Sequence, residues 1–358
     1  MQEAPPGAPT PPKSPSRTVL LGIFVLMLAL TVGLVLVSVP VGIYAVFSGR
    51  LSQVSWTSLG HPYLWIGPVF EQLQFITVSA GYWFLFLTAV YCLFMAIAFR
   101  QERGPIGAVR DAFTNGFASL MTSPFLAFII GTGFLAFTAS IIDSAVTSSG
   151  SAIGGPVGDP LDLLLGYSAA PLVEELGFRV LLIGLVALIL SMGRPWKDAL
   201  GSLWRPSKAL EGLAVGSGAS ILIWVATGFS AVTFGACHVF CGTSWDLGKL
   251  PEAIYGGLVL GVLYVKYGFH VAVLVHWGIN YFGSVYSFYG QAAYGVPINS
   301  ANEFVGQLLV DVDMLFFFGL ACFLLVVYML MRRYYAMRNR VGAGEFDKGL
   351  PLGGTVEP

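Results

Sequence analysis

The chain has 358 residues, of which 56% are hydrophobic and only 10% are charged, and its formal net charge is −1. Such a composition excludes a water-soluble globular domain, and the near-zero charge offers no basic field for nucleic acid, which we therefore exclude as a partner. The composition predicts a polytopic all-α membrane protein, a helical bundle whose first partner is the lipid bilayer.

Both ends of the chain are predicted to be loose tails. The first residues, MQEAPPGAPTPPKSPS, bury too little apolar surface to order themselves, which predicts a disordered tail over residues 1–17. The apolar run that follows is longer than a signal-peptide core and lacks a persuasive cleavage site, so we interpret it as a retained first span. Gly, Pro and polar residues predict a flexible tail over residues 336–358, which leaves one transmembrane domain over residues 18–335.

Eight stretches are apolar and long enough to be transmembrane helices. A crossing needs about 20 mostly apolar residues, because a helix satisfies its own backbone hydrogen bonds in hydrocarbon. The sixth and seventh stretches are the least distinct, since only KYGFH separates them. The aromatic segment 61–75, of mixed polarity, is interpreted as an interfacial helix. The predicted helices are approximately residues 18–48, 78–99, 116–146, 161–192, 212–240, 252–268, 270–290 and 306–331.

Basic residues gather in alternate connections between these helices. Because Lys and Arg favour the cytoplasmic side, this pattern predicts cytoplasmic termini, with the protein in the cell membrane. The residues that carry this prediction are Lys13, Arg17, Arg100, Arg103, Arg110, Arg194, Lys197, Arg205, Lys208, Arg332, Arg333, Arg338 and Arg340.

Three charges interrupt the fourth predicted helix, in the sequence PLVEELGFRVLLIG at residues 171–184. Each charge near the centre of a bilayer costs about 3 kcal/mol. Glu175 and Arg179 are four residues apart and can pair on one helix face. Glu174 is rotated from them by about 100° and has no local partner. It either completes a structural polar cluster or performs chemistry.

Two further helices carry polar residues at a spacing of four. Phe234 and His238 lie in FGACHVF, and His276 and Asn280 lie in VHWGIN. A single buried histidine is more often a satisfied core residue than a catalyst. Together with Glu174, however, the two imidazoles and the amide form a set suited to hydrolysis. Glu174 and His238 could deprotonate a water, while His276 and Asn280 could donate hydrogen bonds to an oxyanion.

The three motifs EELGFR, FGACH and HWGIN, in this order, resemble those of the type II CAAX prenyl endopeptidases and the related CPBP (Abi) intramembrane proteases. The resemblance covers about residues 160–285. It implies an eight-helix bundle with a membrane-embedded, water-accessible site. Glu174 with His238 would then activate water, and His276 with Asn280 would stabilise the oxyanion. The resemblance gives Glu175, Arg179 and Phe234 supporting roles.

The resemblance also implies a peptide or protein substrate, prenylated at a CAAX sequence or otherwise membrane-associated. Under the predicted orientation, Glu174 lies toward the outer half of the membrane, whereas prenyl proteases act on cytosolic substrates. Three explanations stay open: the site works from the outer side, it is deep enough to be reached from the cytoplasm, or the span count is wrong by one.

Two alternatives to a metal-free protease stay open. Glu174, His238 and His276 could supply the three protein ligands of a catalytic zinc. The chain lacks a His-Glu-x-x-His helix, so the cofactor-free glutamate mechanism is preferred. The same polar groups could instead serve a transporter or a non-catalytic scaffold, although no internal repeat of the kind found in transporters is visible. Cys237 and Cys241, beside His238, are interpreted as packing thiols.

Overall fold

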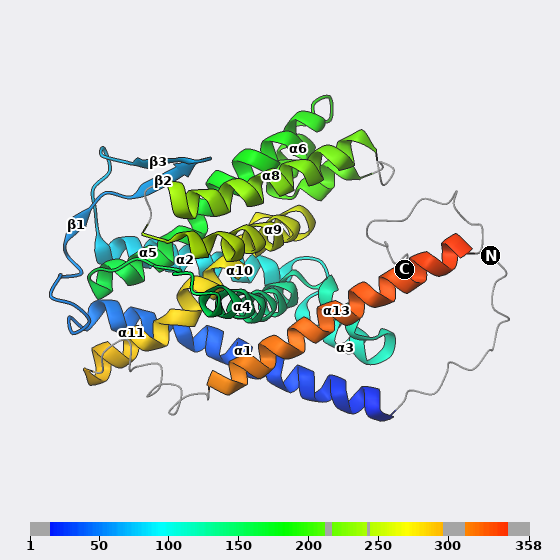
Figure 1. Cartoon of the computed structure of the whole chain (residues 1–358), viewed down its shortest axis with the longest axis horizontal. Helices are drawn as coiled ribbons and strands as arrows, with labels where there is room; N and C mark the ends of the chain where they lie inside the picture. The colour runs from blue at the N-terminus through cyan, green and yellow to red at the C-terminus, as the bar shows by residue number, and fades with distance from the viewer. Residues whose placement is uncertain (1–14, 212–216, 242–243, 296–311, 343–358) are drawn as a thin grey trace.

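The computed structural model describes residues 15–211, 217–241, 244–295 and 312–342, which form a bundle of helices with a small β-hairpin against one side (Figure 1). The predicted all-α membrane bundle is confirmed, because five helices in the described residues are long and apolar enough to cross a membrane. Their outward faces carry apolar side chains such as Leu20, Val225 and Phe229, each more than 60% exposed, as contact with lipid requires. The helices are α1 (Pro15–Phe47), α2 (Ala80–Arg100), α4 (Pro124–Ser148), α8 (Gly218–Phe240) and α13 (Val312–Gly342).

The other three predicted spans also have helical counterparts. Two of these are continuous helices in which a wider π-helical stretch separates two α-helical parts. Such stretches often occur at functional sites, and here each follows directly on a motif residue. The three counterparts are α5 (Pro160–Glu175), η2 (Leu176–Gly184) and α6 (Leu185–Leu190); α9 (Leu250–Tyr267); and α10 (Phe269–Trp277), η5 (Gly278–Phe282) and α11 (Gly283–Tyr294).

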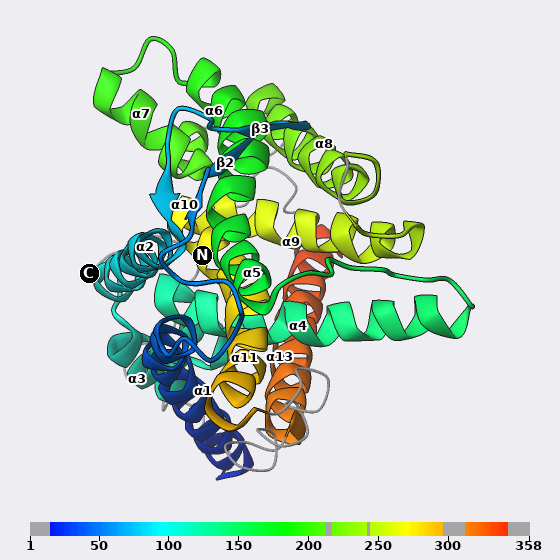
Figure 2. The same cartoon turned by 90° about the vertical axis from the view of Figure 1, so that its left-hand side faces the viewer.

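Helix α10 lies at the centre of the bundle. Every residue from Phe269 to Trp277 is buried, and the helix contacts α2, α4, α5 and α9 (Figure 2). A helix that is apolar all round is expected in the interior. His276 near its end is therefore held away from lipid by neighbours on several sides.

The third predicted helix starts later than expected. Residues 116–123 do not continue the helix, because Gly116 adopts φ 102° and Pro124 begins α4. A short 3₁₀ helix lies there instead, and four more short helical elements lie in the connections that the structure describes. The segments concerned are α3 (Pro105–Asn115), η1 (Phe117–Thr122), α7 (Trp196–Trp204), η3 (Pro206–Leu210) and η4 (Leu247–Lys249).

The interfacial helix predicted over residues 61–75 is wrong. The segment forms an antiparallel hairpin of β2 (Tyr63–Ile66) and β3 (Val69–Gln72), in the register Tyr63 with Gln72. Gly67, at φ 57°, and the following proline make the two-residue turn that a helix could not contain. Two flanking strands, β1 (Leu59–Gly60) and β4 (Val78–Ser79), pair with each other at its base.

The predicted tails lie mostly outside the described residues. At the N-terminus, α1 begins at Pro15, so residues 15–17 are helical and residues 1–14 are not described. At the other end, α13 continues through residues 336–342, and residues 343–358 are not described. Parts of the fifth and eighth predicted helices, residues 212–216 and 306–311, also lie outside the described residues.

Candidate active site

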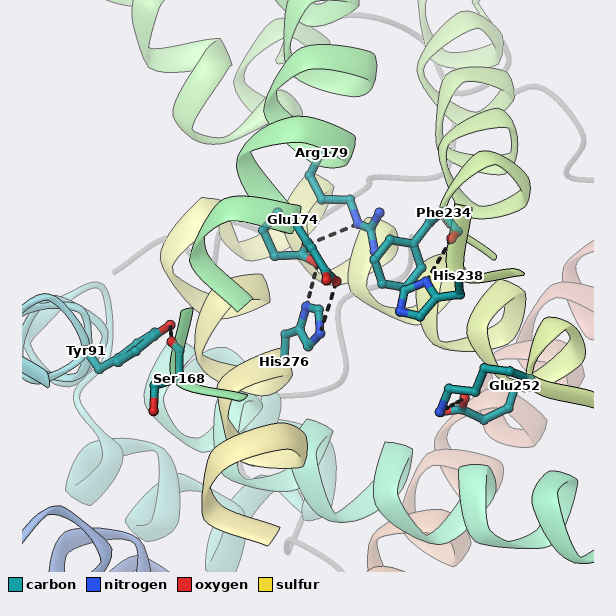
Figure 3. A network of polar contacts seen from close by, with 10 residues as sticks. Tyr91, Ser168, Glu174, Arg179, Phe234, His238, Glu252 and His276 are labelled. Carbon is teal, nitrogen blue, oxygen red and sulfur yellow. Dashed lines mark hydrogen bonds and ion pairs between the residues drawn. The ribbon is translucent and has the colours of Figure 1, made fainter. Parts of the chain in front are cut away.

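The three sequence motifs meet around one cavity of about 450 Å³. Glu174 from α5, His238 from α8, and His276 and Asn280 from the α10–η5 helix all line it, together with Phe234. Figure 3 shows Glu174, Phe234, His238 and His276 gathered from these separate helices. All five were predicted from the sequence as site or supporting residues. A concave space with convergent polar groups is the usual form of a small-molecule or peptide site.

Glu174 is the penultimate residue of α5 and points into this cavity (Figure 3). Its side chain is 14% exposed, and Oε2 lies 3.7 Å from His276 Nε2. That oxygen is buried and makes no hydrogen bond to any residue that the structure describes. The carboxylate therefore keeps acceptor capacity for a water or a substrate.

Glu175 and Arg179 form the predicted ion pair. Glu175 Oε2 lies 3.1 Å from Arg179 Nε, and both side chains are completely buried. Arg179 also donates to Ser230 Oγ at 3.3 Å, and its guanidinium lies 4.5 Å from the centre of the Phe234 ring. Pairing, hydrogen bonding and a cation–π contact together offset the cost of burying the charge.

Glu175 has a second partner, which the sequence did not indicate. Its Oε1 accepts a hydrogen bond from His276 Nδ1 at 3.0 Å, and the two residues lie on different helices. One buried carboxylate thus orients the imidazole while it neutralises Arg179. A hydrogen bond from one ring nitrogen to a carboxylate fixes the orientation of a histidine and the position of its proton.

His238 is oriented by its own helix. Its Nδ1 donates to the Phe234 carbonyl oxygen at 2.9 Å, so that Nε2 of the neutral ring is the nitrogen with a lone pair. The Phe234 ring packs 4.5 Å from the His238 ring and 5.9 Å from the His276 ring, measured between centroids. The phenylalanine is therefore the apolar spacer that holds the two imidazoles and Arg179 apart.

Each π-helical stretch contains a glycine that packs directly against a neighbouring element. A Cβ on Gly177 would lie 2.5 Å from the Trp65 carbonyl oxygen of β2, and one on Gly278 would lie 2.6 Å from Thr132 Oγ1 of α4. Glycine is therefore required where the hairpin and α4 approach the site helices. These close contacts fix how near the hairpin and α4 lie to two of the motif helices.

Several cavity residues were missed by sequence reasoning. They come from connections and helix ends that carry no motif, and one comes from the hairpin, so no spacing pattern could have found them. The residues are Tyr63, Asp162, Trp245, Lys249 and Glu252.

The described residues contain no group of three or more His, Cys, Asp or Glu side chains arranged to hold a metal ion. The ligands required by the zinc alternative, Glu174, His238 and His276, line one cavity without forming such a group. Cys237 and Cys241 are free thiols in contact with each other, and Cys237 packs in an apolar cluster under the hairpin.

Residues 156–282 match the family described as Type II CAAX prenyl endopeptidase Rce1-like. No curated protein and no solved structure matches the chain. The matched segment includes all three motifs and every motif residue named above. It confirms the resemblance drawn from those motifs and leaves α1, α2, α4, α13 and the hairpin outside the match.

Proposed function

Residues 156–282 of this chain belong to the Rce1-like family of type II CAAX prenyl endopeptidases, and on this premise we propose that the protein is a CAAX-type intramembrane protease that uses Glu174 as its base. One observation carries the proposal. The Glu174 carboxylate, with an oxygen that has no hydrogen-bond partner among the described residues, faces a cavity that it shares with two imidazoles and an amide.

In the first step, Glu174 removes a proton from a water in the cavity, and His238 Nε2 accepts the water's second hydrogen as a hydrogen bond. The hydroxide oxygen bonds to the substrate carbonyl carbon, and the electron pair of the C=O bond moves to oxygen. Base catalysis of this kind contributes about 10² to 10⁴ in rate.

In the second step, His276 and Asn280 stabilise the oxyanion. His276 Nδ1 donates a hydrogen bond to Glu175 Oε1. For Nε2 to donate a hydrogen bond to the oxyanion as well, the ring must carry a proton on both nitrogens. The ring faces two carboxylate oxygens, with Glu175 Oε1 3.0 Å from Nδ1 and Glu174 Oε2 3.7 Å from Nε2. The intermediate then collapses: the C–N bond breaks, its electrons go to nitrogen, and the proton held by Glu174 passes to the leaving amine.

The substrate class follows from the family and the surroundings. We propose that the cleaved peptide bond belongs to a substrate that is prenylated at a CAAX sequence or otherwise associated with the membrane. This substrate reaches the site within the bilayer. The reaction as written needs no cofactor. We also propose that the protein lies in the cell membrane and that both of its termini are cytoplasmic.

The test uses the full chain purified in detergent, with a farnesylated CAAX peptide and a panel of apolar peptides as substrates. Glu174→Gln is expected to lower kcat by about 10² to 10⁴, and His276→Ala by about 10² to 10³. The exposed Glu211, at the far end of the bundle, supplies the matched control Glu211→Gln, which should retain activity.

Two results would contradict the proposal. If the Glu174→Gln variant still cleaves the peptide, Glu174 is not the catalytic base. If a chelator abolishes cleavage and added zinc restores it, the protein is a metalloprotease. If no peptide is cut but an ion flux depends on Glu174, the protein is a transporter instead.

A further inference from the structure

One wall of the catalytic cavity comes from outside the family-matched segment. Tyr63 lies in β2 and lines the cavity that Glu174 enters. The matched residues begin only at position 156. The hairpin therefore contributes to the site from outside the segment that the family match covers.

The hairpin is docked firmly enough to position a side chain. The Trp65 ring packs 5.8 Å from the Phe178 ring, and Phe178 packs in turn 5.2 Å from Phe234, which contacts His238. The absence of a side chain at Gly177 lets the backbone of Trp65 approach η2 closely. A chain of packed rings thus runs from the hairpin to the catalytic imidazole.

Tyr63 offers a neutral hydrogen-bond donor beside the catalytic carboxylate. Its side chain is partly buried, and burial, reinforced by the negative charge of Glu174, raises the pKa of its phenol. The hydroxyl therefore keeps its proton throughout the range in which a carboxylate base works. Tyr63 and Glu174 line the same cavity, so the phenol and the carboxylate face one space.

Glu174 Oε2, for its part, has no hydrogen-bond donor among the described residues. The 3.7 Å between its Oε2 and His276 Nε2 exceeds hydrogen-bond length, and no described residue bonds to that oxygen. A buried carboxylate oxygen without a donor is costly, so a nearby hydroxyl has a strong reason to turn toward it.

We propose that Tyr63 is a positioning residue for the protease reaction: its hydroxyl donates a hydrogen bond to the Glu174 carboxylate and fixes the lone pair that takes the proton from water. This inference rests on the proposed function. It makes the hairpin part of the catalytic apparatus, joined to it through one hydroxyl group.

The variant Tyr63→Phe removes only the hydroxyl. A hydrogen bond to a charged group is worth a tenfold to hundredfold change, so kcat is expected to fall by roughly that factor while KM stays unchanged. The acidic limb of the pH–rate profile should move to higher pH, because the carboxylate loses a donor that stabilises its charged form. Tyr82→Phe is the matched control, since Tyr82 is 66% exposed on α2.

The outcomes separate this inference from the proposed function. If the wild-type protein cuts no peptide, the proposed function fails. If the wild type cuts and Tyr63→Phe has the wild-type kcat and pH profile, only the positioning role is overturned. A rise in KM alone also overturns it, since Tyr63 would then contact substrate rather than the base.

A measurement without turnover covers the case of a poorly folded variant. The infrared carboxylate band that disappears in Glu174→Gln belongs to Glu174. In the wild type labelled with 3-fluorotyrosine, whose phenol is a stronger donor, this band should shift, and in Tyr63→Phe the fluorotyrosine shift should vanish. A band that shifts equally in both proteins contradicts the proposal.

Discussion

Glu175 contacts two partners of opposite demands, a guanidinium that needs a negative charge and an imidazole that needs a fixed acceptor. The separation of its two oxygens makes this possible, with Oε2 3.1 Å from Arg179 Nε and Oε1 3.0 Å from His276 Nδ1. The pairing with Arg179 could be predicted from the i, i+4 spacing. The contact with His276 could not, because it depends on how α5 and α10 pack against each other.

The two roles of Glu175 can be separated with the double variant Glu175→Met and Arg179→Met. Removing one partner of a buried pair costs about 3 to 5 kcal/mol, whereas replacing both by apolar residues of similar size is often neutral. Each single variant should therefore melt earlier than the wild type, and the double variant should recover. Its kcat should still be about 10² to 10³ below wild type, because His276 has lost its acceptor.

Thermal unfolding in detergent and peptide cleavage, measured on the same samples, check this prediction. A double variant that recovers both melting temperature and cleavage would show that Glu175 serves stability alone. Failure of the double variant to recover stability would show that the charges are needed by the fold.

Among the elements, the hairpin and the π-helical stretches are the parts that sequence reasoning failed to predict. The segment 61–75 mixes aromatic and polar residues without clear alternation, and in the structure its two halves pair as β2 and β3 around the turn at Gly67. The spacing of four that placed motif residues on one helix face assumed a regular α-helix, so it could not predict the π-helical stretches. The motif helices themselves could be predicted, because long apolar runs with embedded charges have few other interpretations.

Gly177 tests whether docking of the hairpin matters to the site. In Gly177→Ala the new Cβ would meet the Trp65 carbonyl oxygen, so the hairpin must move, at an expected cost of about 1 to 3 kcal/mol. Cleavage should fall as well, since Tyr63 moves with the hairpin. The control is Gly228→Ala on α8, where a Cβ meets nothing within 4 Å and helix propensity should raise stability slightly.

Melting temperature and kcat of the two alanine variants decide the matter. If Gly177→Ala behaves like Gly228→Ala in both measurements, the hairpin is not held by this contact.

Across the whole molecule, contacts between connections fall into two groups at opposite ends of the helices. At one end, Ser52 Oγ donates to Asp159 at 2.5 Å, and Gly154 forms a β-bridge with Trp245. At the other, Glu102 pairs with Arg205. The first group joins connections that follow the first, third and fifth predicted helices, and the second group joins connections that follow the second and fourth. This alternation is what successive membrane crossings produce.

The same grouping bears on the side from which substrate arrives. Asp162, Trp245 and Lys249 extend the catalytic cavity toward the end that carries Ser52 and Asp159. With cytoplasmic termini, that end faces outward, and a substrate would enter from the outer half of the bilayer. The opposite orientation would bring the cavity to the cytoplasmic side, where prenylated CAAX proteins are found.

Cysteine labelling in sealed cells distinguishes the two orientations. In a chain without its four native cysteines, a membrane-impermeant maleimide should label Ser55→Cys and Val157→Cys, both exposed at the cavity end, in intact cells. Lys197→Cys, exposed on α7 at the other end, should react only after permeabilisation. The basic residues that surround Lys197 underlie this expectation, because they favour the cytoplasmic side. Labelling of Lys197→Cys alone in intact cells would reverse the orientation, and labelling of Ser55→Cys and Val157→Cys from different sides would contradict the alternation of crossings itself.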